Sequence, residues 1–222
     1  MSSLFGNNAK QEHPMRRTLF GDMPVEEWPA SPTNEEPWGS FCRAKESIKN
    51  GSKEDGIDIL TEITTRKALE SRHHLQAWHF LRQLGVQPPQ EIHKDVLGVV
   101  VEVGMENGAD FVAAYSDLSA RYYNYSGGGV VWEHPDSSLD ASVGSLLAAG
   151  KEIIEHIGPW DGERPPQPQE GEVRINILTP LGLWFGQGPL DLMSNDPMGG
   201  KALRLAAQLM QDLIEKCDEP KI

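Results

Sequence analysis

The sequence of 222 residues has few of the features by which many proteins reveal their chemistry. Its two cysteines, Cys42 and Cys217, lie far apart and belong to no C-x-x-C motif, so we expect no disulfide framework, and a reducing cytoplasm fits best. No run of 18 apolar residues is present, so no membrane span is expected. The first residues, MSSLFGNNAKQEHPMRR, lack the apolar core of a secretory signal. Together these absences predict a cytoplasmic protein that is not held in a membrane.

Positive charge is scarce, especially in the second part of the chain. The net charge is −13, and residues 96–222 contain 8 Lys and Arg against 19 Asp and Glu, whereas residues 1–95 contain 12 against 14. An acidic surface repels phosphate backbones, so no nucleic-acid partner is expected, but a basic protein would be attracted. The alternative is that the negative charge only keeps the protein in solution.

Signatures of catalysis and of phosphate binding are also missing. The triple glycine 127–129 in RYYNYSGGGVVW is followed by Val130, Val131 and Trp132, which are strand residues, whereas a phosphate loop leads into a helix. The glycines therefore predict a hairpin corner or bulge. The stretch NDPMGGKALR has Ala202 where a P-loop needs Ser or Thr, so it is interpreted as a helix start. There is no G-x-S-x-G motif, and we assign no catalytic residue and no cofactor.

One histidine-rich stretch, ESRHHLQAWH, contains Glu70, His73, His74 and His79. On a helix, Glu70 would neighbour His73 and His74, which could begin a metal site. A structural zinc site normally has four ligands, however. A surface contact between a carboxylate and an imidazole is therefore favoured, and no metal ligand is assigned.

The chain divides into three predicted regions. Residues 1–40 contain five prolines and predict an extended or disordered arm. An apolar cluster in this arm could dock on the body of the protein or on a partner: Leu19, Phe20, Met23, Val25 and Trp28. Residues 41–90 show helical periodicity and predict a helical hairpin. The rhythm of AKESIKNGSKEDGIDILTEI resembles a tetratricopeptide-type hairpin, over barely one repeat.

Residues 91–222 predict an α+β domain. The apolar period changes to 2 in VLGVVVEVGM, GADFVAAY, ARYYNY and VVWE, and Asn107-Gly108 is a strong hairpin signal. A helical stretch follows, then the strands VRINILT and LWFG, and a last helix after Asn195. We expect an antiparallel sheet of five or six strands in the order β-β-β-(β)-α-β-β-α, packed with helices and preceded by the helical hairpin.

The strongest functional signal is a polar sheet face. Strand alternation puts Arg121, Tyr123 and Tyr125 on one side, and it places Arg174 and Asn176 opposite apolar neighbours, as it does Glu102. Arginine and tyrosine are favoured contact residues at interfaces. We therefore name six candidate binding residues: Glu102, Arg121, Tyr123, Tyr125, Arg174 and Asn176. The alternative is an outward face with cross-strand ion pairs.

These observations support three hypotheses of function. The first is a non-catalytic cytoplasmic interaction protein, adaptor-like or immunity-like, whose partner is basic; a homo-oligomer is left open. The second is a small-ligand-binding or sensor domain that uses the Tyr/Arg face or a pocket under the helices. The third is a metal-dependent enzyme built on Glu70, His73 and His74, or on His134.

Overall fold

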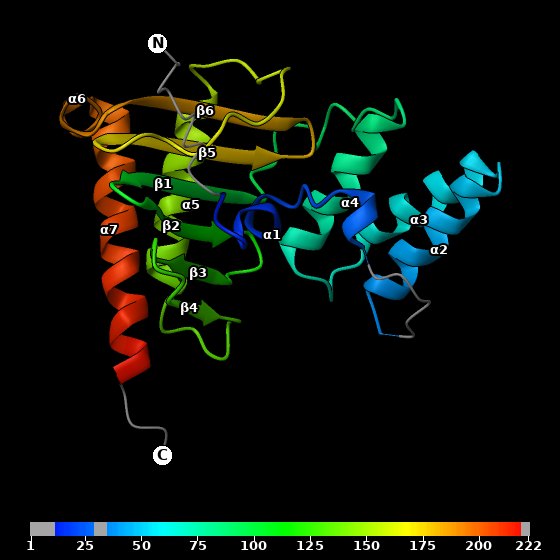
Figure 1. The fold of residues 1–222 in the computed structure, drawn as a ribbon, viewed down its shortest axis with the longest axis horizontal. Coiled ribbons are helices and arrows are strands. Elements are labelled where there is room, and N and C mark those ends of the chain that lie inside the picture. Colours follow the sequence, from blue (N-terminus) through cyan, green and yellow to red (C-terminus); the bar gives the residue numbers. More distant parts are fainter. Residues whose placement is uncertain (1–11, 29–34, 219–222) are drawn as a thin grey trace, which may run out of the picture.

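The computed structural model describes residues 12–28 and 35–218, and it has an α+β fold (Figure 1). Six strands form one antiparallel sheet in the order β4-β3-β2-β1-β5-β6. Helices pack on the sheet, and a helical region precedes it. The predicted fold class is confirmed, including the helix between the fourth and fifth strands.

Short connections determine the order of the strands. The first four strands form a meander of β1 (Gly98–Met105), β2 (Gly108–Tyr115), β3 (Ala120–Tyr123) and β4 (Gly129–Trp132). The last two form a hairpin of β5 (Glu172–Thr179) and β6 (Gly182–Pro189). This hairpin joins the sheet because β5 pairs with β1, which places Glu102 opposite Arg174 and Val100 opposite Asn176.

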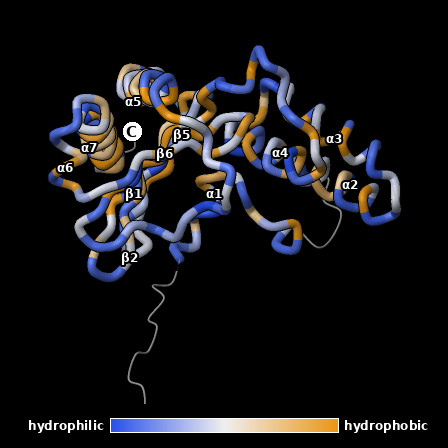
Figure 2. The backbone as a smooth tube through the Cα atoms, turned by 90° about the horizontal axis from the view of Figure 1, so that it is seen from above, coloured by the Kyte–Doolittle hydropathy of each residue, from blue (hydrophilic) through white to orange (hydrophobic). Residues whose placement is uncertain are grey.

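The apolar face of the sheet is covered by two helices. Helices α5 (Asp140–Ile154) and α7 (Pro197–Asp218) lie on this face, as the view from above shows (Figure 2). Alternate strand residues such as Val99, Val101 and Ile175 point toward these helices and are buried in the main core. The short helix α6 (Leu190–Asn195) precedes α7, whose start is capped by Asp196, since its Oδ1 accepts hydrogen bonds from the Met198 and Gly199 amides at 3.0 and 2.6 Å.

The helical region lies beside the sheet (Figures 1 and 2). It consists of α2 (Trp38–Lys49), α3 (Lys53–Thr65) and α4 (Ser71–Gln83), each packed on the next. Its own core is built from large apolar side chains, which include Phe41, Leu60, Ile63, Trp78 and Leu81. Helix α4 also places Leu75 in a separate cluster on the second face of the sheet.

The segment of residues 12–28 joins these two parts. It forms α1 (Arg16–Phe20) and a 3-10 turn, η1 (Val25–Glu27). Leu19 and Phe20 are buried against the second sheet face, and the Tyr115 hydroxyl donates to the Leu19 carbonyl at 2.7 Å. Trp28 is instead buried in the core of the helical region. The apolar residues of the predicted arm thus lie in the protein's own core.

The triple glycine closes the hairpin between β3 and β4, as predicted. Gly127 has φ of +91°, and a Cβ at Gly129 would lie 2.3 Å from Cδ1 of Tyr123. The Asn124 Oδ1 accepts hydrogen bonds from the backbone amides of residues 126 and 128 at 3.1 and 2.9 Å. This side-chain turn competes with the ladder, so β3 ends at Tyr123. The prediction that Tyr125 continues the strand is therefore wrong.

No helix in the ranges 12–28 and 35–218 is long and apolar enough to cross a membrane.

Candidate functional site

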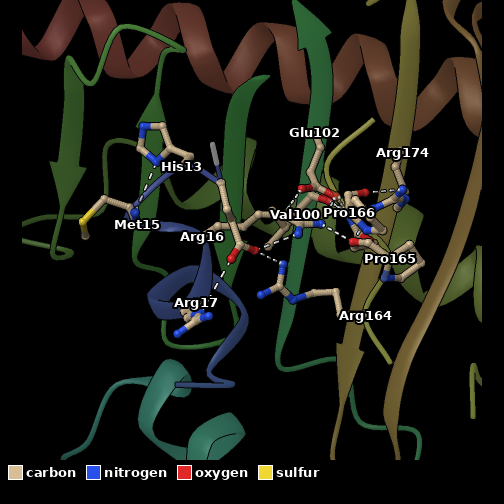
Figure 3. A network of polar contacts seen from close by, with 12 residues as sticks. His13, Met15, Arg16, Arg17, Val100, Glu102, Arg164, Pro165, Pro166 and Arg174 are labelled. Atoms are coloured by element: carbon tan, nitrogen blue, oxygen red, sulfur yellow. Dashed lines mark hydrogen bonds and ion pairs between the residues drawn. The ribbon is translucent and has the colours of Figure 1, made fainter. Parts of the chain in front are cut away.

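A network of buried charges lies on the second face of the sheet (Figure 3). Its centre is Glu102 of β1, whose exposed fraction is 0%. The Glu102 Oε1 accepts from Arg16 Nε of α1 at 2.6 Å, and its Oε2 accepts from Arg174 Nη1 and Asn176 Nδ2 of β5, both at 3.1 Å. One carboxylate therefore joins α1 to two central strands.

Other donors of the network bind the connector between α5 and β5, strand β6, and Glu12, whose Oε1 accepts from Arg16 Nη1 at 2.9 Å. The Arg16 Nη2 donates to the Pro165 carbonyl and the Arg174 Nη2 to the Pro166 carbonyl, each at 2.8 Å. The Arg174 Nε also donates to Gln187 Oε1 at 2.8 Å. Burial lowers the pKa of the Arg174 guanidinium, and the charge of Glu102 opposes this change. All the partners named here belong to the same chain, so the network is an internal interface between its segments.

The six predicted binding residues are divided by the structure. Glu102, Arg174 and Asn176 come together in the network, as described above. Arg121 is also buried, at 3% exposure, but it pairs with Glu70 of the helical region, with 2.9 Å between Nη2 and Oε2. The interpretation of an outward sheet face is therefore wrong, because α1, α4 and the connector cover these four residues.

The two tyrosines lie apart from the charged network. Tyr123 is partly buried, and its ring centroid is 5.8 Å from that of His13. Tyr125 is exposed and borders a pocket of about 370 Å³ near the start of the described chain. The predicted face is therefore not one continuous surface.

The histidine-rich stretch lies on α4 and its start, and its side chains contact different partners. Glu70 pairs with Arg72 and Arg121, and His74 Nε2 donates to the Arg66 carbonyl at 3.0 Å. His73 points inward, with its ring centroid 6.3 Å from that of Trp38. Within the described ranges, no three His, Cys, Asp or Glu side chains are grouped so that they could hold a metal ion.

Burial lowers the pKa of His73 to about 4, and the charge of Arg72 acts in the same direction. His73 is therefore neutral at pH 7. His134 lies away from this helix, and its Nε2 is 2.9 Å from Asp140 Oδ1.

A cleft with a volume of about 480 Å³ lies at the junction of the helical region and the sheet. It lies between α4, the end of α1, the stretch 160–164 of the connector and the turn between β5 and β6. Its walls combine apolar side chains such as Phe20, Leu75 and Leu183 with charged ones. This volume and mixed lining are typical of small-molecule sites.

One cation in this cleft stands out. Arg82, in the last turn of α4, uses Nη1 to donate to the Pro180 carbonyl at 2.7 Å. No carboxylate of the described chain pairs with it, and burial lowers the pKa of Arg82 to about 10. A positive charge that is largely removed from water without an anionic partner costs free energy, and such groups are concentrated at functional sites.

Arg164 in the same cleft shows the opposite situation. It donates to both carboxylate oxygens of Asp22, at 2.5 and 3.1 Å, and it also pairs with Glu12 at 3.1 Å. Burial alone would lower the pKa of Arg164, but Asp22 and Glu12 raise it overall. The charge of Arg164 is therefore already neutralised within the protein, whereas no carboxylate in the described ranges neutralises that of Arg82.

Two further groups complete the polar lining. The Nε2 of His79 is 3.0 Å from Gln83 Nε2, which as an amide nitrogen can only donate, so His79 accepts as a neutral ring. Burial lowers the pKa of His79, and the charges of Arg82 and Arg164 act in the same direction. At the rim, Trp160 is 45% exposed, and its ring is held by a bond of 2.8 Å from Nε1 to the Glu163 carbonyl.

Sequence reasoning did not find this cleft. The only local signal is that His79 and Arg82 are three residues apart and so share one face of α4. The other walls come from elements that lie about 60 residues before and 80 to 100 residues after it in the chain, and no motif connects them. A comparison of the chain with protein-family models, curated proteins and solved structures finds no match.

Proposed function

We propose that this chain is a cytoplasmic binding protein for a small anionic molecule, which it holds in the cleft between α4 and the β5–β6 turn. The observation that carries the proposal is Arg82, a largely buried guanidinium without a carboxylate partner in the described chain. An anion would supply the missing charge, and it would do so where water is partly excluded and charge-assisted hydrogen bonds are strong.

The neighbours of Arg82 support this role. Arg164 is neutralised by Asp22 and holds the cleft wall in place, and His79 is neutral, so neither competes with Arg82 for the charge of the ligand. The apolar side chains of Phe20, Leu75 and Leu183 offer contact area for an uncharged part of the ligand. The cytoplasmic assignment rests on the sequence, with its two widely spaced cysteines.

The proposal is tested by a thermal-shift screen of the protein against small mono- and dianions. A ligand that binds only the native state raises the melting temperature, because at a concentration of 100 Kd it increases the free energy of unfolding by about 2.7 kcal/mol. Arg82→Met should abolish the shift, and Arg204→Met, at an exposed arginine of α7, should retain it. If no anion raises the melting temperature of the wild type, or if Arg82→Met retains the shift, the proposal is wrong.

A second role, as the partner of a basic protein, is favoured by one surface feature. Helix α6 exposes Leu190 by 41% and Leu192 by 65%, in the part of the chain that carries most of the negative charge. Exposed leucines in an acidic part of the chain are typical of a contact region. Affinity purification from native lysate at low and high salt, with Leu192→Asp compared with Val131→Asp on β4, tests this role. It is contradicted if the two variants capture the same proteins as the wild type.

A further inference from the structure

We infer that the ligand of the cleft is a monocarboxylate with a flat apolar body, which Arg82 binds through two parallel hydrogen bonds. This inference rests on the proposed function and names the chemical class of its ligand. It follows from three features of the cleft, which are the free edge of Arg82, the amount of uncompensated charge, and the aromatic rim.

The first feature is the edge of the guanidinium that remains available. Nη1 of Arg82 is bound to the Pro180 carbonyl, and no hydrogen bond from Nε or Nη2 is formed within the described chain. Nε–H and Nη2–H lie side by side in the planar group and point the same way. This pair of donors matches the two oxygens of a carboxylate.

A glycine lies beside the guanidinium of Arg82. Gly182 begins β6 with φ of +135°, and a Cβ there would lie 3.7 Å from Nε of Arg82. The glycine adopts a conformation that other residues rarely take. Gly182 therefore places no side chain against the guanidinium of Arg82, which itself lines the cleft.

The second feature is that the cleft has only one unit of positive charge to offer. Arg164 is paired with Asp22 and Glu12, and His79 is neutral. Asp161 and Glu163 also line the cleft and are exposed at its rim. A phosphate monoester carries a charge of about −1.5 to −2 at pH 7, which exceeds the single charge of Arg82 and is repelled by the rim carboxylates more strongly than a single negative charge would be. A carboxylate, with one negative charge, matches it.

The third feature is the aromatic wall. The Trp160 ring is fixed by its bond to the Glu163 carbonyl and by an edge contact with Phe185, at a centroid distance of 5.4 Å. A ring that is already ordered loses little conformational entropy when a ligand packs on it. A flat apolar body would therefore gain contact with Trp160, and with Phe20 and Leu183, which also line the cleft.

The test uses three probes that share a phenyl group and differ in charge: phenylacetate, phenylacetamide and phenyl phosphate. Binding is followed by NMR titration of the full-length protein, with the arginine Nε–H signals as a direct readout. We expect phenylacetate to bind at least about tenfold more tightly than either of the other two, because only it matches both the charge and the two donors. We also expect phenylacetate to shift the Nε–H signal of one arginine, and this signal should be absent from the spectrum of Arg82→Lys.

Two variants separate the geometry from the charge. Arg82→Lys keeps the positive charge but loses the paired donors, so its affinity for phenylacetate should fall about tenfold, whereas Arg204→Lys should leave it unchanged. If phenyl phosphate binds more tightly than phenylacetate, or if Arg82→Lys binds as well as the wild type, the carboxylate assignment is overturned while an anion site remains. If neither anion binds the wild type, this inference fails, and if the wider anion screen is also negative, the proposed function fails with it.

Discussion

Replacing Glu102 by Gln is the most direct test of how the second sheet face is held together. The substitution keeps the size of the side chain but removes the negative charge that Arg16 and Arg174 share. Arg174 would then remain buried without its carboxylate partner, and Arg16 would keep only its pair with Glu12, at 2.9 Å. Removing one partner of a buried ion pair typically costs about 3–5 kcal/mol. Since about 1 kcal/mol shifts the melting temperature of a chain of this size by about 2–4 °C, we expect a decrease of about 6–20 °C.

The assay is urea unfolding followed by circular dichroism, together with thermal melts at the same pH. Glu155→Gln is the matched control, because this carboxylate is exposed and lies 3.7 Å from Lys94, so the free energy of unfolding should change by less than about 0.5 kcal/mol. Arg16→Met, alone and combined with Glu102→Gln, gives the coupling between the two residues, expected at about 1–3 kcal/mol. A loss below about 1 kcal/mol for Glu102→Gln would refute the view that this network holds α1 on the sheet.

Two further predictions concern the cores. Because burial holds the pKa of His73 near 4, below its ordinary value of about 6.5, the unfolded chain takes up a proton first and stability falls as the pH decreases from about 6.5 toward 4. Between pH 7 and pH 5, the free energy of unfolding of His73→Leu should therefore decrease by about 2 kcal/mol less than that of the wild type, as measured by urea unfolding. Equal decreases would contradict this. In α5, a Cβ at Gly150 would lie 2.5 Å from Val99 Cγ2, whereas a Cβ at Gly144 meets nothing within 4 Å. In the same assay, Gly150→Ala should decrease the free energy of unfolding by about 1–3 kcal/mol, and Gly144→Ala should increase it by about 0.5–1 kcal/mol. An increase at both positions would show that the helix is not packed tightly on the sheet.

Much of the fold was predictable because it depends on local patterns. Period-2 alternation in the stretch around Val99–Val103 and the Asn107-Gly108 turn specify a hairpin without reference to other parts of the chain. The triple glycine forms a turn as predicted, because the backbone preference of glycine is also a local property. The extent of β3 was predicted less well, since the Asn124 side chain closes the turn early and so removes Tyr125 from the strand.

The candidate site was predictable only in part. Alternation placed Arg174 and Asn176 on the same side of one strand, and the pairing of β5 with β1 brings Glu102 to that side. It could not show that α1 and α4 cover that face, since the burial of Arg121 depends on Glu70, 51 residues away in the chain. An exposed and a buried arginine look the same in a sequence.

The sequence by itself thus determined the α+β class, the strand alternation, the hairpin corner at the triple glycine and the acidic character of the second part of the chain. Only the tertiary structure decided that the polar sheet face is an internal interface and that no carboxylate of residues 12–28 and 35–218 pairs with Arg82 in the cleft. The physical reason is that burial and charge compensation arise from contacts between distant segments. Arg164 pairs with Asp22 across 142 residues, whereas the partner of the Arg82 side chain among the described residues is the backbone carbonyl of Pro180.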